Sequence, residues 1–207
     1  LLVLGFLAIG LFEWGNSFQD LSVSERINAA LLQSTTARSS GLATVPIHEM
    51  SQRTWYVLDA LMFVGGGSAS AAGGIKVTTL AVLVLAIIAE ARGDRDTEAF
   101  GKRLPPDVLR LAIAATFLGA TLVGLGTLAL LHITGLPLAN VLFEAISAFS
   151  TCGLSTGITP GLPNAGKWVL VIMMFAGRTG TMTLAGALAL RNRRRVIRLP
   201  EERPVIG

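Results

Sequence analysis

Two polar segments built from small residues have the composition of a cation site made from backbone carbonyls. The first, QSTTARSSGLAT, covers residues 33–44, and the second, SAFSTCGLSTGITP, covers residues 147–160. Carbonyl oxygens can replace the hydration shell of a monovalent cation, and glycine permits the backbone angles that turn successive carbonyls toward one side. A short helix ending at each segment would direct its negative end toward the same point. These features predict a cation site that needs no carboxylate.

The two segments occupy equivalent places in an internal repeat. Shifting the sequence by 112 positions, the separation of Gly41 and Gly153, aligns the repeat without a gap. Each unit has an apolar helix, a short helix, a polar loop and another apolar helix, so both units run in the same direction. A single loop of this kind is more often a tight turn between helices, whereas its recurrence favours a functional site. Other matched positions are Asn28 with Asn140, Thr44 with Thr156, and Met62-Phe63 with Met174-Phe175.

The elements that position these loops have the composition of membrane helices. Of the 207 residues, 52% are hydrophobic and 14% are charged, whereas soluble domains carry about 25% charged residues. This difference argues against a soluble enzyme, a disordered protein and a nucleic-acid-binding domain. A spanning helix needs about 20 apolar residues. The predicted membrane segments are 1–12, 55–64, 75–89, 111–131 and 168–190.

Two further apolar segments, 27–32 and 138–149, are too short to cross a membrane. We expect them to form re-entrant or pore helices. The chain also begins inside an apolar run without an initiator methionine. We therefore expect it to be part of a longer membrane protein.

A glycine-rich segment, GGGSASAAGG at residues 65–74, interrupts two apolar stretches. Each glycine costs a helix about 1 kcal/mol relative to alanine, so a break in the helix is expected here. A soft element of low local stability inside a membrane is suited to act as a gate. The alternative is a kinked helix that does not move.

The distribution of basic residues predicts the topology. Eleven lysines and arginines lie in segments 90–110 and 191–207, whereas four lie in the loops on the opposite side. The positive-inside rule places both basic segments, and therefore the C-terminus, in the cytoplasm. The RNRRR run is accordingly interpreted as a cytoplasmic anchor rather than a contact with nucleic acid. With Cys152 as the only cysteine, an internal disulfide is excluded.

Several stretches of the sequence resemble the potassium-translocating subunits of the Trk/Ktr/HKT superfamily. These are SSGL, MFVGGGSASAAGGIKVTT, STCGLSTGIT and MFAGRTGTMTL, and the closing LPEERPVIG is similar to the end of bacterial Ktr-type membrane subunits. The resemblance covers essentially the whole chain but only the C-terminal half of the family's architecture. It implies an all-α membrane protein with two parallel helix–pore-helix–helix repeats, forming half of a four-repeat, pseudo-fourfold pore.

The resemblance also implies how the chain is divided. A third pore repeat would cover residues 1–90, with a truncated first helix and a broken second helix. A cytoplasmic loop would cover 91–107, a fourth pore repeat 108–190, and a basic cytoplasmic tail 191–207.

Matching positions identify the expected filter and gate. Potassium would bind at the filter residues, which are Ser39, Ser40, Gly41, Leu42, Thr151, Cys152, Gly153 and Leu154. The gate beneath the filter would involve Gly65, Gly66, Gly67, Ser68, Gly73, Gly74, Lys76 and Arg178. Family members often carry Thr-Ala at the position of Ser39-Ser40 and Val at that of Cys152. Both changes are small and leave the carbonyls in place, so they bear on fine selectivity.

The function implied by the resemblance is potassium uptake across a bacterial plasma membrane by a multi-pass, non-enzymatic transporter without a cofactor. Uptake would be passive or coupled to sodium or protons in symport. The expected partners are the potassium ion, a second copy of the subunit, a cytosolic nucleotide-binding regulatory subunit and membrane lipid, with no role for nucleic acid.

Two other function classes remain as alternatives. A secondary transporter of an organic solute also uses re-entrant loops, but it would need inverted repeats, whereas these repeats are parallel. A hydrolase is considered because residues 153–157 match G-x-S-x-G, yet that motif needs a preceding strand and a nearby histidine and acid.

Three charged residues in apolar surroundings are further candidates. Glu13 and Glu144 are possible proton or cation sites, although structural pairing is the favoured interpretation for both. Arg178 interrupts segment 168–190 and aligns with Gly66 in the repeat. We interpret it as a barrier or latch beneath the filter, with pairing to Glu144 or to an acid outside this chain as the alternative.

Overall fold

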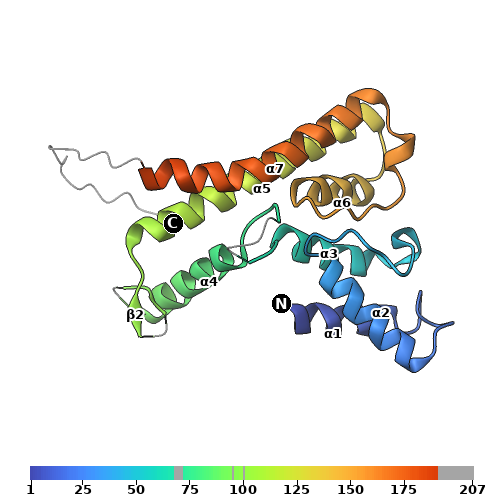
Figure 1. Cartoon of the computed structure of the whole chain (residues 1–207), viewed down its shortest axis with the longest axis horizontal. Helices are drawn as coiled ribbons and strands as arrows, with labels where there is room; N and C mark the ends of the chain where they lie inside the picture. Colours follow the sequence, from blue (N-terminus) through green and yellow to red (C-terminus); the bar gives the residue numbers. More distant parts are fainter. Residues whose placement is uncertain (68–71, 95, 100, 191–207) are drawn as a thin grey trace.

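The computed structural model describes residues 1–67, 72–94, 96–99 and 101–190, with the side chains of 181–190 left undescribed. The described chain is predominantly α-helical (Figure 1). Its α-helices are α1 (Leu2–Glu13), α2 (Val23–Thr36), α3 (Gln52–Phe63), α4 (Val77–Arg92), α5 (Pro106–Thr134), α6 (Leu138–Phe149) and α7 (Asn164–Leu190). The short elements are the 3-10 turns Ile47–Glu49 and Thr159–Gly161, and the strands β1 (Glu98–Ala99) and β2 (Lys102–Arg103).

The C-terminal half is a bundle of α5, α6 and α7, which pack against one another (Figure 1). Within the described residues, α5 alone is both long and apolar enough to cross a membrane. Small residues let these helices approach closely, as is usual in membrane bundles. A Cβ atom added to Gly126 of α5 would lie 2.2 Å from the sulfur of Met173 on α7. The predicted helix at 111–131 is confirmed and extends further at both ends.

The N-terminal half is built from α1, α2 and α3, and α1 packs against the other two. Helix α2 begins with a capping box, in which the Ser22 hydroxyl accepts from the Glu25 N–H and the Ser22 N–H donates to the Glu25 carboxylate. Hydrogen bonds from Ser22 lower the pKa of Glu25. The prediction of a short helix at 27–32 is therefore confirmed, but its bounds were too narrow.

Helices α3 and α6 join the two halves. The aromatic rings of Trp55 and Phe143 lie 6.1 Å apart, and those of Phe63 and Phe149 lie 6.2 Å apart. Because the earlier residue of α3 pairs with the earlier residue of α6, and the later residue with the later one, the two helices run in the same direction. The shared core thus holds the loop that follows α6 at a fixed place relative to the N-terminal half.

Helix α4 leaves the N-terminal half and packs against α5 (Figure 1). Beyond it, β1 and β2 form a short antiparallel hairpin, with Arg103 paired to Asp96 at 2.8 Å. The sequence predicted only a loop in this region. The basic tail predicted at 191–207 lies outside the described residues.

Candidate cation site

The two predicted filter loops lie side by side. The Ser39 hydroxyl donates to the Thr151 carbonyl at 3.5 Å, and the Cys152 thiol donates to the Thr36 carbonyl at 3.3 Å. A Cβ atom added to Gly41 would lie 2.9 Å from the Cys152 carbonyl oxygen. The structure therefore brings together two segments that are 112 residues apart in the sequence.

The loops share an unusual backbone pattern. Ser39 and Gly41 have φ values of 120° and 65°, and their counterparts Thr151 and Gly153 have values of 52° and 94°. Within the described ranges, Ser39 and Thr151 are the only residues other than glycine with positive φ. Such conformations cost of order 1–3 kcal/mol each and persist only where the surroundings hold them. The two loops thus maintain positive φ values, two of them in residues other than glycine, at equivalent places.

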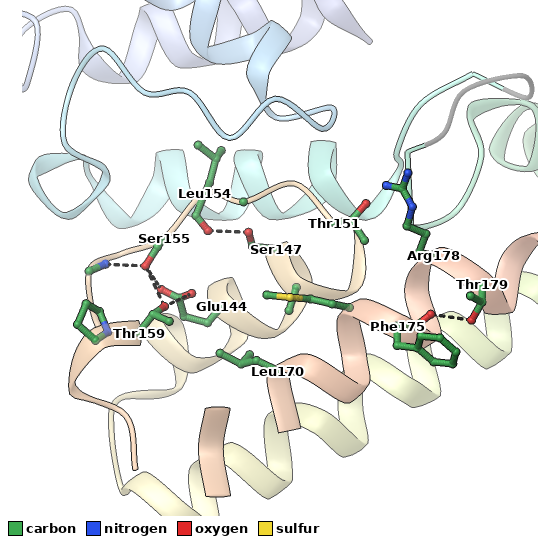
Figure 2. Close-up of a pocket in the computed structure, with 15 residues that line it drawn as sticks. Glu144, Ser147, Thr151, Leu154, Ser155, Thr159, Leu170, Phe175, Arg178 and Thr179 are labelled. Carbon is green, nitrogen blue, oxygen red and sulfur yellow. Dashed lines mark hydrogen bonds between the residues drawn. The ribbon is translucent and has the colours of Figure 1, made fainter. Parts of the chain in front are cut away.

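The second loop is anchored to α6 at both of its ends (Figure 2). The Cys152 N–H donates to the Ser147 carbonyl at 3.0 Å, and the Ser147 hydroxyl donates to the Leu154 carbonyl at 2.6 Å. Sequence reasoning did not single out Ser147. A hydroxyl in the last turn of a short apolar helix is the signal that points to it.

The remaining predicted filter residues differ between the loops. In the first loop, Ser40 and Leu42 are exposed. In the second loop, Cys152 and Leu154 are buried. The second loop is therefore the more enclosed of the two.

Glu144 lies in the middle of the same helix, behind the second loop (Figure 2). Its carboxylate accepts hydrogen bonds from the Ser155 hydroxyl at 2.5 Å, the Thr156 N–H at 3.0 Å and the Thr159 hydroxyl at 2.9 Å. None of the ion pairs among the described residues includes Glu144 or Arg178. The alternative that pairs Arg178 with Glu144 is therefore wrong, because the carboxylate is occupied by hydroxyl and amide donors.

A cavity of about 790 Å³ opens beside these residues. Its lining includes Glu144, Ser155 and Thr159 at one end and Thr151 and Arg178 at the other. No histidine lines it. Instead of a strand, α6 precedes the G-x-S-x-G residues. The structure thus lacks the surroundings that a nucleophilic serine requires.

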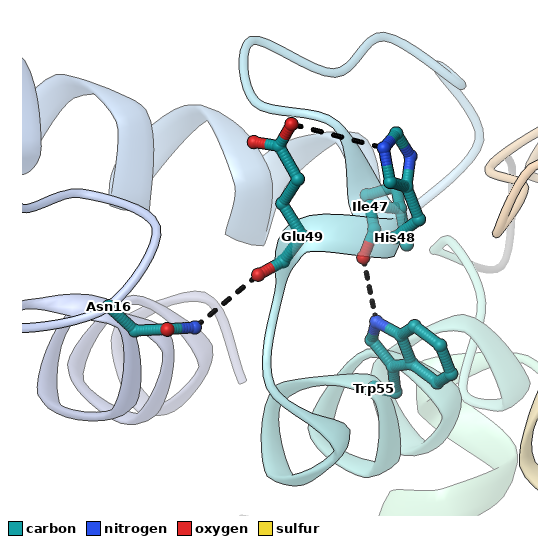
Figure 3. A network of polar contacts seen from close by, with 5 residues as sticks. All are labelled: Asn16, Ile47, His48, Glu49 and Trp55. Atoms are coloured by element: carbon teal, nitrogen blue, oxygen red, sulfur yellow. Dashed lines mark hydrogen bonds and ion pairs between the residues drawn. The ribbon is translucent and has the colours of Figure 1, made fainter.

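His48 lies elsewhere, in the connection between the first loop and α3 (Figure 3). Its ring is 3.9 Å from the Glu49 carboxylate, and both side chains are largely exposed. The same connection is held by the Trp55 indole, which donates to the Ile47 carbonyl at 2.8 Å, and by Asn16, which donates to the Glu49 carbonyl. These contacts are structural and fix the path from the first loop to α3.

The connection between α3 and α4, residues 64–76, is closed at its base by backbone hydrogen bonds. The Gly65 N–H donates to the Ile75 carbonyl at 2.8 Å, and the Val77 N–H donates to the Gly66 carbonyl at 3.2 Å. Gly65, Gly66, Gly73 and Gly74 are buried, and Gly67 is exposed. Ser68 lies outside the described residues.

This connection touches the second loop. The Gly73 N–H donates to the Thr151 hydroxyl at 3.0 Å, and a Cβ atom added to Gly73 would lie 2.9 Å from the Phe149 carbonyl oxygen. The Lys76 ammonium donates to the Ala72 carbonyl at 2.7 Å, so this lysine is tied to the connection itself. The predicted break of the helix is confirmed, and it lies directly against the end of α6.

Arg178 projects from α7 toward the α3–α4 connection (Figure 2). Its neighbour Gly177 sits against the end of α6, since an added Cβ atom would overlap the Phe149 carbonyl oxygen at 1.7 Å. Because Gly177 precedes Arg178 on α7, this contact fixes the position of Arg178 relative to the end of α6 and the second loop. The side chain lines the cavity together with Thr151.

Comparison with known proteins identifies the family of this chain. The family model TrkH, "Cation transport protein", matches residues 1–192. Ktr system potassium uptake protein D of Bacillus subtilis is 38% identical over 204 residues, which is 98% of this chain and 45% of the relative. Ktr system potassium uptake protein B of Vibrio alginolyticus is 31% identical over 209 residues, covering 100% of this chain and 46% of the relative.

A solved structure shows the same fold. The potassium transporter TrkH from Vibrio parahaemolyticus matches with a TM-score of 0.74 at 23% identity, covering 94% of this chain and 43% of that one. This chain spans less than half the length of these relatives. From the family match and the identity to Ktr proteins, we conclude that the chain is a membrane protein of the TrkH family of cation transport proteins and is not an enzyme.

Proposed function

We propose that the complete protein takes up potassium across the bacterial plasma membrane through a filter of backbone carbonyls. The filter would include residues 39–42 and 151–154 of this chain. The observation that carries the proposal is the shared positive φ at the matched positions of two loops that face each other. Its relatives named as potassium uptake proteins support the choice of ion.

The short helices support the same proposal. Helices α2 and α6 end where the two loops begin, so each directs its partial negative charge toward them. This arrangement favours a cation without placing a carboxylate in its path. We propose that α2 and α6 are the pore helices of a third and a fourth repeat, each spanning the residues assigned above.

The gate in this proposal is the α3–α4 connection, with Lys76 and Arg178 beside it. The contact of Gly73 with Thr151 supports a position for this glycine-rich segment beneath the second loop, where it would obstruct the path of the ion. As further parts of the proposal, the protein acts as a homodimer with a cytosolic nucleotide-binding regulatory subunit, and its C-terminus is cytoplasmic. The name "Ktr system" of two relatives supports an assembly of several components.

The direct test uses the full-length protein in bacterial cells that lack their own potassium uptake systems. We expect it to restore growth at low potassium and to take up rubidium in competition with potassium. Cells that carry correctly inserted protein but show no uptake of either ion would contradict the proposed function.

Shortening the α3–α4 connection tests the gate. Deleting residues 68–72, which lie mostly outside the described part of the chain, removes the obstruction and leaves the filter intact. We expect the maximal rubidium flux to rise roughly tenfold, the effect of lowering a barrier by about 1.4 kcal/mol, with little change in apparent affinity. An unchanged flux, or loss of transport by folded protein, would show that the connection is not a barrier.

Removing the Thr151 hydroxyl tests the link between this connection and the filter. Thr151→Val keeps the shape of the side chain but loses the acceptor used by the Gly73 N–H. One hydrogen bond contributes about 1 kcal/mol, so we expect flux to rise about fivefold. In the protein that lacks residues 68–72, Thr151→Val should cause no further rise in flux. Equal effects in both backgrounds would contradict this link.

A further inference from the structure

Glu144 is a carboxylate that is 5% exposed and whose hydrogen bonds all lead to the segment following the second loop. Its donors are two hydroxyls and one backbone N–H, supplemented by the Thr156 hydroxyl at 3.3 Å. No cationic side chain pairs with it among the described residues. A buried charge without an opposite charge is costly, so its placement next to a proposed cation path calls for a reason.

Two residues of α6, Glu144 and Ser147, hold the second filter loop and the residues that follow it. Ser155 and Thr156 directly follow Leu154, whose carbonyl accepts from Ser147 on the same helix. Ser147 lies one turn after Glu144 and also accepts from the Cys152 N–H. Helix α6 therefore holds residues 152, 154, 155 and 156 through the side chains of Glu144 and Ser147 and through the Ser147 carbonyl.

The first loop has no such anchor. The residue equivalent to Glu144 is Leu32, and the counterpart of Thr156 is the exposed Thr44. Leu42 is 65% exposed, whereas its counterpart Leu154 is 2% exposed. The enclosed geometry of the second loop thus coincides with the presence of Glu144.

We infer that Glu144 is a positioning residue for cation selectivity, which holds the second filter loop rigid and adds negative potential behind it. This inference rests on the proposed function. The carboxylate can accept from all of its donors at once. A glutamine amide would present an NH₂ group to part of this set and would remove the charge. The cation in the filter then loses both a favourable field and a fixed set of carbonyls.

Glu13 offers a matched control. Its carboxylate is fully buried and accepts from Asn16, Ser17, Ser51 and Thr54, which lie outside both filter loops. It therefore has the same kind of surroundings without a link to the filter. Replacing Glu13 with glutamine therefore removes a buried carboxylate that accepts from hydroxyl groups, as Glu144 does, but it changes no contact of the proposed filter.

The experiment compares Glu144→Gln, Glu144→Asp, Glu13→Gln and Gly153→Ser in the full-length transporter. Selectivity is the ratio of the sodium and potassium concentrations that half-inhibit rubidium uptake, at matched amounts of inserted protein. We expect Glu144→Gln to lower this ratio about tenfold, equivalent to about 1.4 kcal/mol, and Glu144→Asp to recover part of it. Glu13→Gln should leave the ratio unchanged even if it lowers thermal stability.

The outcomes separate this inference from the proposed function. If Gly153→Ser lowers the ratio and Glu144→Gln does not, the role of Glu144 is wrong and the filter stands. If neither variant lowers it, the filter itself is wrong. If Glu13→Gln lowers the selectivity ratio as much as Glu144→Gln does, the effect is one of general destabilisation and the inference is overturned. Should Glu144→Gln fail to insert, Thr159→Val removes one donor and keeps the charge, and an unchanged ratio in that variant overturns the inference.

Discussion

Replacing Gly153 with serine in the full-length protein is expected to lower the preference for potassium over sodium by roughly tenfold. Gly153 has a φ of 94°, a region that side chains rarely adopt. A left-handed conformation costs residues other than glycine about 1–2 kcal/mol, and the backbone can relieve this strain by turning its carbonyls away from the ion. Competition of sodium and potassium for rubidium uptake measures the change.

Gly93 provides the control for this substitution. It has a φ of 75° at the C-cap of α4, outside both filter loops and the segment that contacts Glu144, and an added Cβ atom there meets nothing within 4 Å. Gly93→Ser should therefore lower stability without changing selectivity. Gly41→Ser should act at least as strongly as Gly153→Ser, because its added Cβ would lie 2.9 Å from the Cys152 carbonyl oxygen. Parental selectivity in both loop variants would remove the two glycines from the filter.

The sequence was sufficient to predict the elements that hydrophobic length and glycine content determine. The segment at 138–149 forms α6 with the predicted bounds, and the break at 65–74 separates α3 from α4. Helix α2 begins before the apolar run at 27–32, because its start depends on the capping-box spacing of Ser22 and Glu25 rather than on hydrophobic length. The hairpin of β1 and β2 has no alternating apolar pattern, so nothing in its composition indicated a strand.

The candidate site was predictable only in part. The repeat identified Gly41 and Gly153, whose positive φ values fit the need for glycine. It gave no reason to expect positive φ at Ser39 and Thr151, because threonine disfavours this conformation and only contacts across the fold hold it. The hydroxyl donors of Glu144 are likewise a tertiary feature, since a chain turn must bring residues 155–159 back over the middle of α6.

Arg178 is the position where removal of a charge should have the largest effect on flux. A central arginine costs about 2.5–3.5 kcal/mol to insert into a membrane, and such residues normally face a polar interior. The structure points this side chain toward the α3–α4 connection, next to Thr151 (Figure 2). Lys76 lies on the same connection, where its ammonium donates to the Ala72 carbonyl. Together they would oppose a cation that has passed the filter.

Arg178→Gln retains some hydrogen bonding but removes the charge, so we expect rubidium flux to rise roughly tenfold. Arg178→Lys retains the charge and loses the planar set of five donors, so the barrier should persist while any latch on the connection weakens. Arg110 on α5 is the control, because its side chain is 82% exposed and its carboxylate partner is 4.0 Å away. Arg110→Gln should leave flux unchanged. If both Arg178 variants insert and fold normally yet transport at the parental rate, the positive charge is neither barrier nor latch, and the α3–α4 connection must act without it.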